Sequence, residues 1–285
     1  MNKLFVVGNP IKHSLSPEIH NFWMKKYKIK GTYEKLELNT EIEKFKRQKK
    51  GLIQRIRQGE VRGVNITVPF KQKFNDVIDK LDNSAKYTKA INTIYKENNK
   101  IIGANTDGVG FCRSLLEDFE FVIPSTIFIL GAGGAVYGIL SELLKHKPKI
   151  VYLCNRTRNK AEVLANHFSK INLSEETKIV VDDISFNPPS DVKLFINASY
   201  IGMQDNFDIK EYFRNLSIEC FVYDINYNKN LTIFNLMARK IGIGNLRNVN
   251  GKHMLVRQAA ESFTKWFGVK IVKADIEEVL NLINL

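Results

Sequence analysis

The feature that most constrains the fold is a regular alternation of short apolar runs with segments of helical periodicity. In the later part of the chain the apolar runs cover 126–130, 149–155, 178–181, 194–199 and 221–225. Most of the segments between these runs show helical spacing. Strands that alternate with helices indicate a doubly wound parallel sheet. The sequence therefore predicts an α/β fold in this region.

The earlier part of the chain also mixes strands and helices. We predict strands over 4–7, 32–38 and 63–68, a hairpin over 91–105, and helices from Ser16 and over 41–57. Ser16 followed by Pro17 is typical of an N-cap and a first helical turn. A helical pattern returns after about residue 245. The chain of 285 residues is long enough for two α/β domains.

A glycine-rich turn follows the predicted strand 126–130 and opens a helix. Its residues are Gly131, Ala132, Gly133, Gly134 and Ala135. In this strand–turn–helix context the glycines let the backbone approach a pyrophosphate, which the helix N-terminus favours. The third fingerprint position is Val136, where Gly or Ala is usual, so the match is imperfect. The turn predicts a dinucleotide site.

The end of the next strand discriminates between cofactors. An NAD enzyme carries Asp or Glu there to bind the ribose 2′-hydroxyl. This chain instead has Asn155, Arg156, Thr157 and Arg158, with Lys160 close behind. Cationic side chains suit a 2′-phosphate, which Arg can bind in a bidentate manner. The sequence therefore predicts NADP.

The charge is unevenly distributed. The chain carries a net charge of +13, of which residues 1–106 contribute +12 (22 basic, 10 acidic) and residues 107–285 contribute +1 (21 basic, 20 acidic). The densest basic run is 43–57. Charge runs are usually solvated helix faces, and we expect that here. A nucleic-acid or membrane-binding face is the alternative.

Cysteine usage and the termini bear on the compartment. Cys112, Cys154 and Cys220 are far apart, which excludes a disulfide framework or a cysteine-based metal site. The five histidines form no metal constellation. The sequence has no signal-peptide pattern and no apolar run of the roughly 20 residues that a bilayer span needs. We expect a cytoplasmic protein without a metal.

Three polar segments lie where strands end. Residues 8–21 place the hydroxyls of Ser14 and Ser16 at a strand-to-helix turn, where they can bind a carboxylate. Lys71 follows the strand 63–68, and Asp107 lies where the chain enters the second domain. We expect Lys71 and Asp107 to form a charge pair at the interdomain cleft.

These segments resemble the shikimate dehydrogenase family along essentially the whole chain. The family's pattern looks like G-x-P-x-x-H-S-x-S-P-x-x-H-N, N-x-T-x-P-x-K, A-x-N-T and N-T-D-x-x-G, in that order. This chain supplies those motifs at 8–21, 65–71, 90–93 and 105–110. It adds the glycine turn and further family-like segments at 155–157, 197–203 and 254–258.

The resemblance implies reversible NADPH-dependent reduction of 3-dehydroshikimate to shikimate, in the biosynthesis of aromatic amino acids through chorismate. It implies a catalytic role for Lys71 with Asp107 as its partner. It also implies substrate-binding roles for several polar residues, namely Ser14, Ser16, Thr67, Asn92, Tyr227 and Gln258. Gly251 is assigned to the cofactor site.

The resemblance further implies a discontinuous substrate domain and an inserted Rossmann-type domain. We expect residues 1–106 and 247–285 to form the substrate-binding domain, and residues 107–246 to bind NADP. We expect a monomer or homodimer that binds a small molecule and no nucleic acid or membrane. Two alternatives stay open: a quinate/shikimate dehydrogenase that uses NAD, and a non-catalytic basic binding protein on the same fold.

Overall fold

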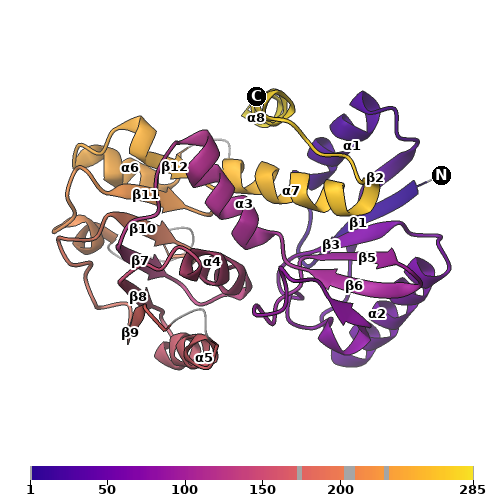
Figure 1. Cartoon of the computed structure of the whole chain (residues 1–285), viewed down its shortest axis with the longest axis horizontal. Coiled ribbons are helices and arrows are strands. Elements are labelled where there is room, and N and C mark those ends of the chain that lie inside the picture. Colours follow the sequence, from indigo (N-terminus) through magenta and orange to yellow (C-terminus); the bar gives the residue numbers. More distant parts are fainter. Residues whose placement is uncertain (1, 172–174, 202–208, 228–230, 285) are drawn as a thin grey trace. The chain divides into compact units, whose positions relative to one another are not determined.

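The computed structural model describes residues 2–171, 175–201, 209–227 and 231–284, and these fall into two compact units (Figure 1). Unit 1 comprises Met1–Gly110 and Leu255–Leu285, and unit 2 comprises Phe111–Met254. Both divisions lie inside helices, α3 (Asp107–Arg113) and α7 (Lys252–Phe267). The boundaries predicted from the sequence, after residues 106 and 246, lie four and eight residues earlier. The α/β class with two sheets is confirmed.

Unit 1 contains a mixed six-stranded sheet in the order β2-β1-β3-β5-β6-β4. Its strands are β1 (Asn2–Gly8), β2 (Gly31–Glu37), β3 (Gly63–Ile66), β4 (Lys80–Leu81), β5 (Thr93–Glu97) and β6 (Lys100–Ala104). β1 runs parallel to β2 and β3, whereas β5 runs antiparallel to β3 and β6. The ends of β1, β3 and β6 and the start of β5 therefore meet at one edge. The predicted strands and hairpin are confirmed, and the two-residue β4 is an addition.

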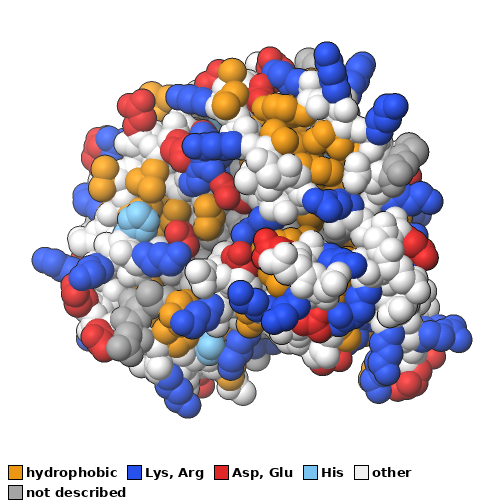
Figure 2. All heavy atoms as spheres, turned by 45° about the vertical axis from the view of Figure 1, so that its right-hand side comes forward, with side chains coloured by type: hydrophobic (Ala, Val, Ile, Leu, Met, Phe, Trp, Pro, Cys, Tyr) orange, Lys and Arg blue, Asp and Glu red, His pale blue; other side chains and the backbone are white. Residues whose placement is uncertain are grey.

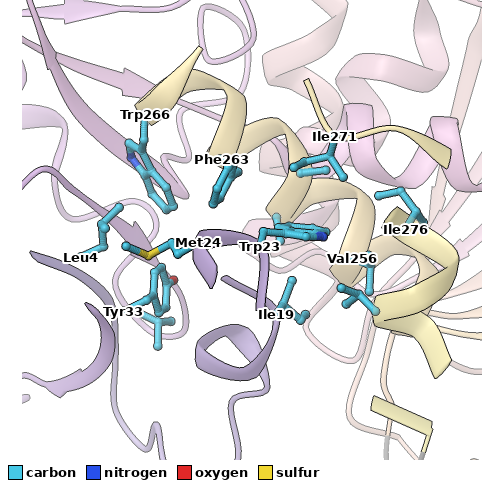
Figure 3. Close-up of a cluster of buried hydrophobic side chains, with 14 of the residues drawn as sticks. Leu4, Ile19, Trp23, Met24, Tyr33, Val256, Phe263, Trp266, Ile271 and Ile276 are labelled. Atoms are coloured by element: carbon cyan, nitrogen blue, oxygen red, sulfur yellow. The ribbon is translucent and has the colours of Figure 1, made fainter. Parts of the chain in front are cut away.

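Helices cover both faces of this sheet (Figure 1). On one face α1 (Ser16–Lys26), α7 and α8 (Lys273–Asn284) enclose an aromatic core. Figure 3 shows Trp23, Phe263 and Trp266 within this cluster, where the Trp23 and Phe263 rings lie 5.7 Å apart. On the other face α2 (Ile42–Arg57) packs with Phe45 and Leu52 inward. The C-terminal segment is thus part of the core of unit 1.

The start of α1 differs from the prediction in one respect. The helix begins at Ser16, the cap position is Leu15, and no side chain caps the helix. The prediction that Ser16 is the N-cap is therefore wrong. Pro17 still lies in the first turn, where its missing N–H has no helical partner to lose.

The basic run forms α2, and acidic side chains neutralise most of its charge. Lys44 and Lys46 pair within the helix region with Glu41 and Glu43. Three further cations reach carboxylates after the helix: Lys49 with Asp76, Arg55 with Glu60 and Arg57 with Asp79. Over the whole face of the molecule drawn in Figure 2, blue cationic side chains are interspersed with red acidic ones. This pattern fits a solvated helix face.

Unit 2 contains a fully parallel six-stranded sheet in the order β12-β11-β10-β7-β8-β9. Its strands are β7 (Thr126–Leu130), β8 (Ile150–Cys154), β9 (Lys178–Asp182), β10 (Leu194–Asn197), β11 (Phe221–Asp224) and β12 (Asn248–Asn250). Its helices include α4 (Gly134–Leu144), α5 (Arg158–Ser169) and α6 (Ile233–Lys240), and a π-helical turn, Ser114–Asp118, extends α3. The doubly wound sheet is confirmed.

The region after residue 245 is only partly helical. A 3₁₀ turn (Asn245–Arg247) leads into β12, which adds a parallel edge to β11 before α7 begins. A three-residue strand is too short to show a period in the sequence. Short 3₁₀ turns also occur at Asn75–Val77 and Ile209–Phe213. Among the described residues, no helix is both long and apolar enough to cross a membrane.

We expect the packing of α7 against the sheet of unit 1 to be essential for the stability of that unit. Phe263 is fully buried, and its replacement by alanine leaves a cavity that costs about 3–5 kcal/mol. Chemical denaturation of Phe263→Ala measures this loss. Val272→Ala, at a side chain that is 53% exposed, serves as the control and should change the free energy of unfolding by less than about 0.5 kcal/mol. Equal effects would contradict the role of α7 in the core.

Candidate functional site

A partly buried ion pair lies at the edge of the unit 1 sheet where the strand ends meet. Lys71 follows β3, and Asp107 is the first residue of α3. Lys71 Nζ lies 2.7 Å from Asp107 Oδ2, and the two side chains are 14% and 5% exposed. Water screens a pair in this position less than it screens a fully exposed one. The charge pair predicted from the sequence is therefore present.

Asn92 fixes the other oxygen of the aspartate. Its Nδ2 donates to Asp107 Oδ1 at 3.0 Å, while its Oδ1 accepts the backbone N–H of Thr106 at 2.8 Å. These two bonds allow only one orientation of the amide. The Asp107 backbone N–H donates to Asn105 Oδ1 at 3.0 Å, which fixes the start of α3. The carboxylate is thereby held on both oxygens.

Gln258 reaches the same cluster from α7. Its Oε1 accepts from Asn92 Nδ2 at 3.3 Å, and its Nε2 donates to the carbonyl of Leu255 at 2.9 Å. Four of the predicted residues, Lys71, Asn92, Asp107 and Gln258, are thus joined by hydrogen bonds although they come from segments far apart in the sequence.

The other predicted substrate residues of unit 1 lie on the neighbouring turns. Val7 of β1 is paired with Ile66 of β3, so the turns after both strands start side by side. Thr67 follows β3, and its backbone N–H donates to the carbonyl of Val7 at 2.8 Å. Ser14 and Ser16 follow β1 as half-buried and buried residues, and the Ser16 N–H donates to Ser14 Oγ at 3.3 Å. Tyr227 belongs to unit 2, where it is half buried.

A buried polar network behind Asn92 was missed by sequence reasoning. Asn65 Nδ2 donates to Thr93 Oγ1 at 3.1 Å and to Ser262 Oγ at 3.0 Å. Asn65 Oδ1 accepts from the hydroxyl of Tyr33 at 2.7 Å. Ser262 lies four residues after Gln258, which is the same face of α7, and this spacing is the signal that could have identified it.

His20 lies close to this network but is not suited to proton transfer. Its ring stacks on Tyr33 with a centroid distance of 4.3 Å and is fully buried. Burial lowers the pKa of His20 to about 3, so the ring is neutral near pH 7. We therefore assign it to the core.

Unit 2 has a cavity of about 250 Å³ at the carboxyl ends of its central strands. The turn after β7, the turn after β8 and the loop after β10 line it. The lining residues are Leu130, Gly131, Ala132, Gly133, Asn155, Arg156, Thr157, Lys160, Ala198, Ser199, Tyr200 and Ile201. The strand order reverses between β7 and β10, and such a switch point is where doubly wound sheets bind ligands.

The glycine turn has the geometry that a close backbone approach requires. Gly131 has φ of +121°, and a Cβ there would lie 2.4 Å from the carbonyl oxygen of Ala198. Asn155 Oδ1 accepts the backbone N–H of Ala132 at 3.1 Å, which ties the turn to the end of β8. Gly134 and Ala135 form the first turn of α4 and do not line the cavity.

The predicted cationic residues are arranged unequally. Arg156 and Lys160 line the cavity, together with Thr157. Arg158 does not line it and pairs with Glu162 at 3.0 Å and with Asp182 at 3.6 Å. Gly251 also does not line the cavity. Its backbone packs closely on Ile225, and a Cβ at Gly251 would lie 1.9 Å from the carbonyl oxygen of Ile225.

No group of three His, Cys, Asp or Glu side chains among the described residues is placed to hold a metal ion.

Comparison with known proteins identifies the family. Residues 6–94 match the family model of the shikimate dehydrogenase substrate binding domain. The chain is 41% identical over 287 residues to the shikimate dehydrogenase (NADP⁺) of Pelagibacter ubique, with 100% of both chains covered. The chain belongs to the shikimate dehydrogenase family.

Solved structures of shikimate dehydrogenases share its fold. One in complex with NADP⁺ is 30% identical with a TM-score of 0.84 and covers 100% of this chain and 96% of its own. Another, from Listeria monocytogenes in complex with shikimate and NAD, is 26% identical with a TM-score of 0.82 over 98% and 96% of the two chains. Their family consists of oxidoreductases, which confirms the enzyme class predicted from the sequence.

The residues of this family member fit a dinucleotide at the unit 2 cavity. The glycine turn leaves room beside the N-terminus of α4, where a pyrophosphate would meet backbone N–H groups. Arg156 and Lys160 supply positive charge on the side of β8. The segment 197–203 matched from the sequence contributes Ala198 and Ser199 here, and its residues 202 and 203 lie outside the described residues.

The glycine turn provides a matched pair of variants. We expect Gly131→Ala to lower the free energy of unfolding by about 1–3 kcal/mol, because alanine there has positive φ and contacts Ala198. Gly133→Ala is the control, since a Cβ at Gly133 meets nothing within 4 Å. Thermal and chemical unfolding of both variants measures the difference. Equal stability of the two would contradict the described geometry of the turn.

Proposed function

We propose that this chain catalyses the reversible NADPH-dependent reduction of 3-dehydroshikimate to shikimate, with Lys71 and Asp107 as the catalytic pair. The observation that carries the proposal is the partly buried contact of 2.7 Å between Lys71 Nζ and Asp107 Oδ2 at the edge of the unit 1 sheet. The family model that covers residues 6–94 describes a substrate binding domain, which supports assigning the substrate to unit 1. Unit 2, which the sequence predicted as residues 107–246, is proposed to bind the cofactor.

The pair is suited to the proton transfer that the reaction requires. When bound, NADPH supplies the hydride that reduces C3, and the oxygen on C3 must then gain a proton. Lys71 beside this oxygen stabilises the negative charge that develops on it and delivers the proton. Asp107 orients Lys71 and accepts a hydrogen bond from a ring hydroxyl. In the oxidation of shikimate the proton moves in the opposite direction.

The remaining polar residues at this edge are proposed to orient the substrate. Ser14 and Ser16 would bind its carboxylate through their hydroxyls, and Tyr227 of unit 2 would lie near that group. Thr67, Asn92 and Gln258 would bind the ring hydroxyls. Asn92 is held in one orientation by Thr106, so its position is set before substrate binds.

We propose NADP as the cofactor because the segment after β8 carries cationic side chains. Residues 155–161 contain no Asp or Glu that could bind a ribose 2′-hydroxyl. Arg156 and Lys160 line the cavity and would bind the 2′-phosphate, with Asn155 and Thr157 shaping the turn. Arg158 is proposed to contribute less, since Glu162 and Asp182 compensate its charge. The relative of known structure that holds NADP⁺ supports this choice, whereas the Listeria structure holds NAD.

Two alternative functions were considered from the sequence. A quinate/shikimate dehydrogenase would use NAD, which is the cofactor in the Listeria structure. A non-catalytic basic binding protein was suggested by the charge of residues 1–106. The ion pairs on α2 and the intact Lys71–Asp107 pair favour an enzyme over that alternative.

The proposal includes the setting of the reaction. We place the enzyme in the cytoplasm as a monomer or homodimer that acts on small molecules and binds no nucleic acid or membrane. The three cysteines are buried and unpaired, as expected in a reducing compartment.

The role of Lys71 can be tested by its removal. We expect Lys71→Ala to lower kcat for shikimate oxidation by about 10²–10⁴-fold, because the proton loses its relay, while KM for shikimate changes only a few-fold. Steady-state assay of NADPH formation measures both constants.

Lys73→Ala is the matched control for that experiment. Lys73 is exposed, and its Nζ lies 5.8 Å from the ring centroid of Phe45. Its replacement should leave kcat within about twofold of wild type. A Lys71→Ala enzyme with wild-type kcat would exclude lysine from the mechanism.

The cofactor assignment can be tested by replacing three cationic side chains after β8. We expect Arg156→Ala and Lys160→Ala each to raise KM for NADP⁺ about 10-fold or more and to leave KM for NAD⁺ unchanged, because each removes a charged hydrogen bond to the 2′-phosphate. Arg158→Ala should change KM for NADP⁺ by less than about threefold. Steady-state kinetics with both cofactors measures these constants. If Arg158→Ala raised KM for NADP⁺ more than the other two variants, the assignment would be refuted.

A further inference from the structure

A buried carboxylate in unit 2 takes no part in the proposed chemistry. Asp224 is the last residue of β11 and is 1% exposed. Its Oδ1 accepts three hydrogen bonds, from Asn197 Nδ2 at 3.0 Å, from the Asn226 backbone N–H at 3.0 Å and from Asn226 Nδ2 at 2.9 Å. Burial raises the pKa of Asp224 to about 6. A buried carboxyl group is costly for stability, so these contacts call for an explanation.

The first contact leads from Asp224 to the cavity of unit 2. Asn197 is the last residue of β10, and its Oδ1 accepts the backbone N–H of Ser199 at 3.1 Å and the Ser199 hydroxyl at 2.8 Å. Ser199 lines the cavity. Because Asn197 donates to Asp224, its amide can present only its oxygen to Ser199. The carboxylate thus determines the orientation of the amide that holds the loop after β10.

The second contact joins two more loops to the first. Asn226 Nδ2 also donates to the carbonyl of Ser199 at 2.7 Å. The carbonyl of Asn226 accepts the backbone N–H of Gly251 at 3.0 Å. Asp224 therefore lies at the centre of a set of bonds that ties together the loop after β10, the loop after β11 and the turn before α7.

The position of these loops relative to the sheet indicates which half of the proposed cofactor they would contact. The glycine turn after β7 and the cations after β8 account for the pyrophosphate and the 2′-phosphate of the proposed cofactor. β10 and β11 lie on the other side of β7 in the strand order. A dinucleotide extends across the switch point of such a sheet, so its second half lies over the carboxyl ends of β10 and β11.

We propose that Asp224 is a positioning residue that holds the loops of unit 2 which bind the nicotinamide-riboside half of the cofactor. It acts through Asn197 and Asn226 and does not itself touch the reacting atoms. The inference rests on the proposed function, because it takes NADP as the ligand of unit 2.

The test compares the whole cofactor with one half of it. Adenosine 2′,5′-bisphosphate carries the adenosine and the 2′-phosphate but lacks the nicotinamide riboside. We expect Asp224→Ala to weaken the binding of NADP⁺ about tenfold, because Asn197 and Asn226 lose a buried acceptor and no longer fix Ser199. The same variant should bind adenosine 2′,5′-bisphosphate within about twofold of wild type. Isothermal titration of the full-length protein measures both affinities.

Two further variants separate positioning from stability. Asp224→Asn keeps an oxygen that can accept the three hydrogen bonds and should restore the affinity for NADP⁺ to within about threefold of wild type. Asp191→Ala removes an exposed carboxylate at the opposite, amino-terminal side of β10 and should affect neither ligand. Retained binding of adenosine 2′,5′-bisphosphate shows that each variant is folded.

The outcomes are distinguishable. Equal weakening of both ligands by Asp224→Ala, or unchanged binding of NADP⁺, would overturn the positioning role. An Asp224→Asn variant as weak as Asp224→Ala would also overturn it, because the acceptor geometry would then not suffice. If wild-type protein bound neither ligand, the proposed function itself would fail, and this result is separate from the others.

Discussion

The ion pair between Lys71 and Asp107 is the constraint on which the rest of the unit 1 site depends. Both charges are mostly shielded from water, so removing one leaves the other uncompensated in a poorly solvated place. The chain holds the pair by placing its two members after β3 and at the start of α3, where strand ends meet. Asn92 occupies the second oxygen of Asp107 and is itself fixed by Thr106. The proposed catalytic groups are therefore positioned by the backbone.

In unit 2 the loops are positioned by close contacts between backbone segments at glycine residues. Gly131 brings the turn after β7 against the carbonyl of Ala198, and Gly251 brings the turn before α7 against Ile225. Neither position accommodates a Cβ in the described geometry. The turn after β7 is thus tied to the loop after β10, and the turn before α7 to the loop after β11. Asp224 connects the loops after β10 and β11. In the proposed function this unit binds NADP and unit 1 supplies the proton relay.

Local patterns in the sequence predicted the fold and part of the site. The alternation of apolar runs and helices predicted the parallel sheet, and the glycine turn predicted the place of the cavity. The Lys71–Asp107 pair was predicted from the sequence, but other contacts between distant segments were not evident in local patterns. Ser262 joins Asn65 across 197 residues, and Lys49 meets Asp76 across 27. Arg158 was predicted to bind phosphate, whereas its pairing with Glu162, one helical turn later, became evident only in the structure.

The most direct test of the account is to follow the hydrogen that leaves C3 of shikimate. Shikimate carrying deuterium at C3 is incubated with the purified protein and NADP⁺, and the reduced cofactor is examined by mass spectrometry or NMR. The account predicts that deuterium appears in NADPH as 3-dehydroshikimate forms. Unlabelled NADPH, or no reduced cofactor at all, would contradict it.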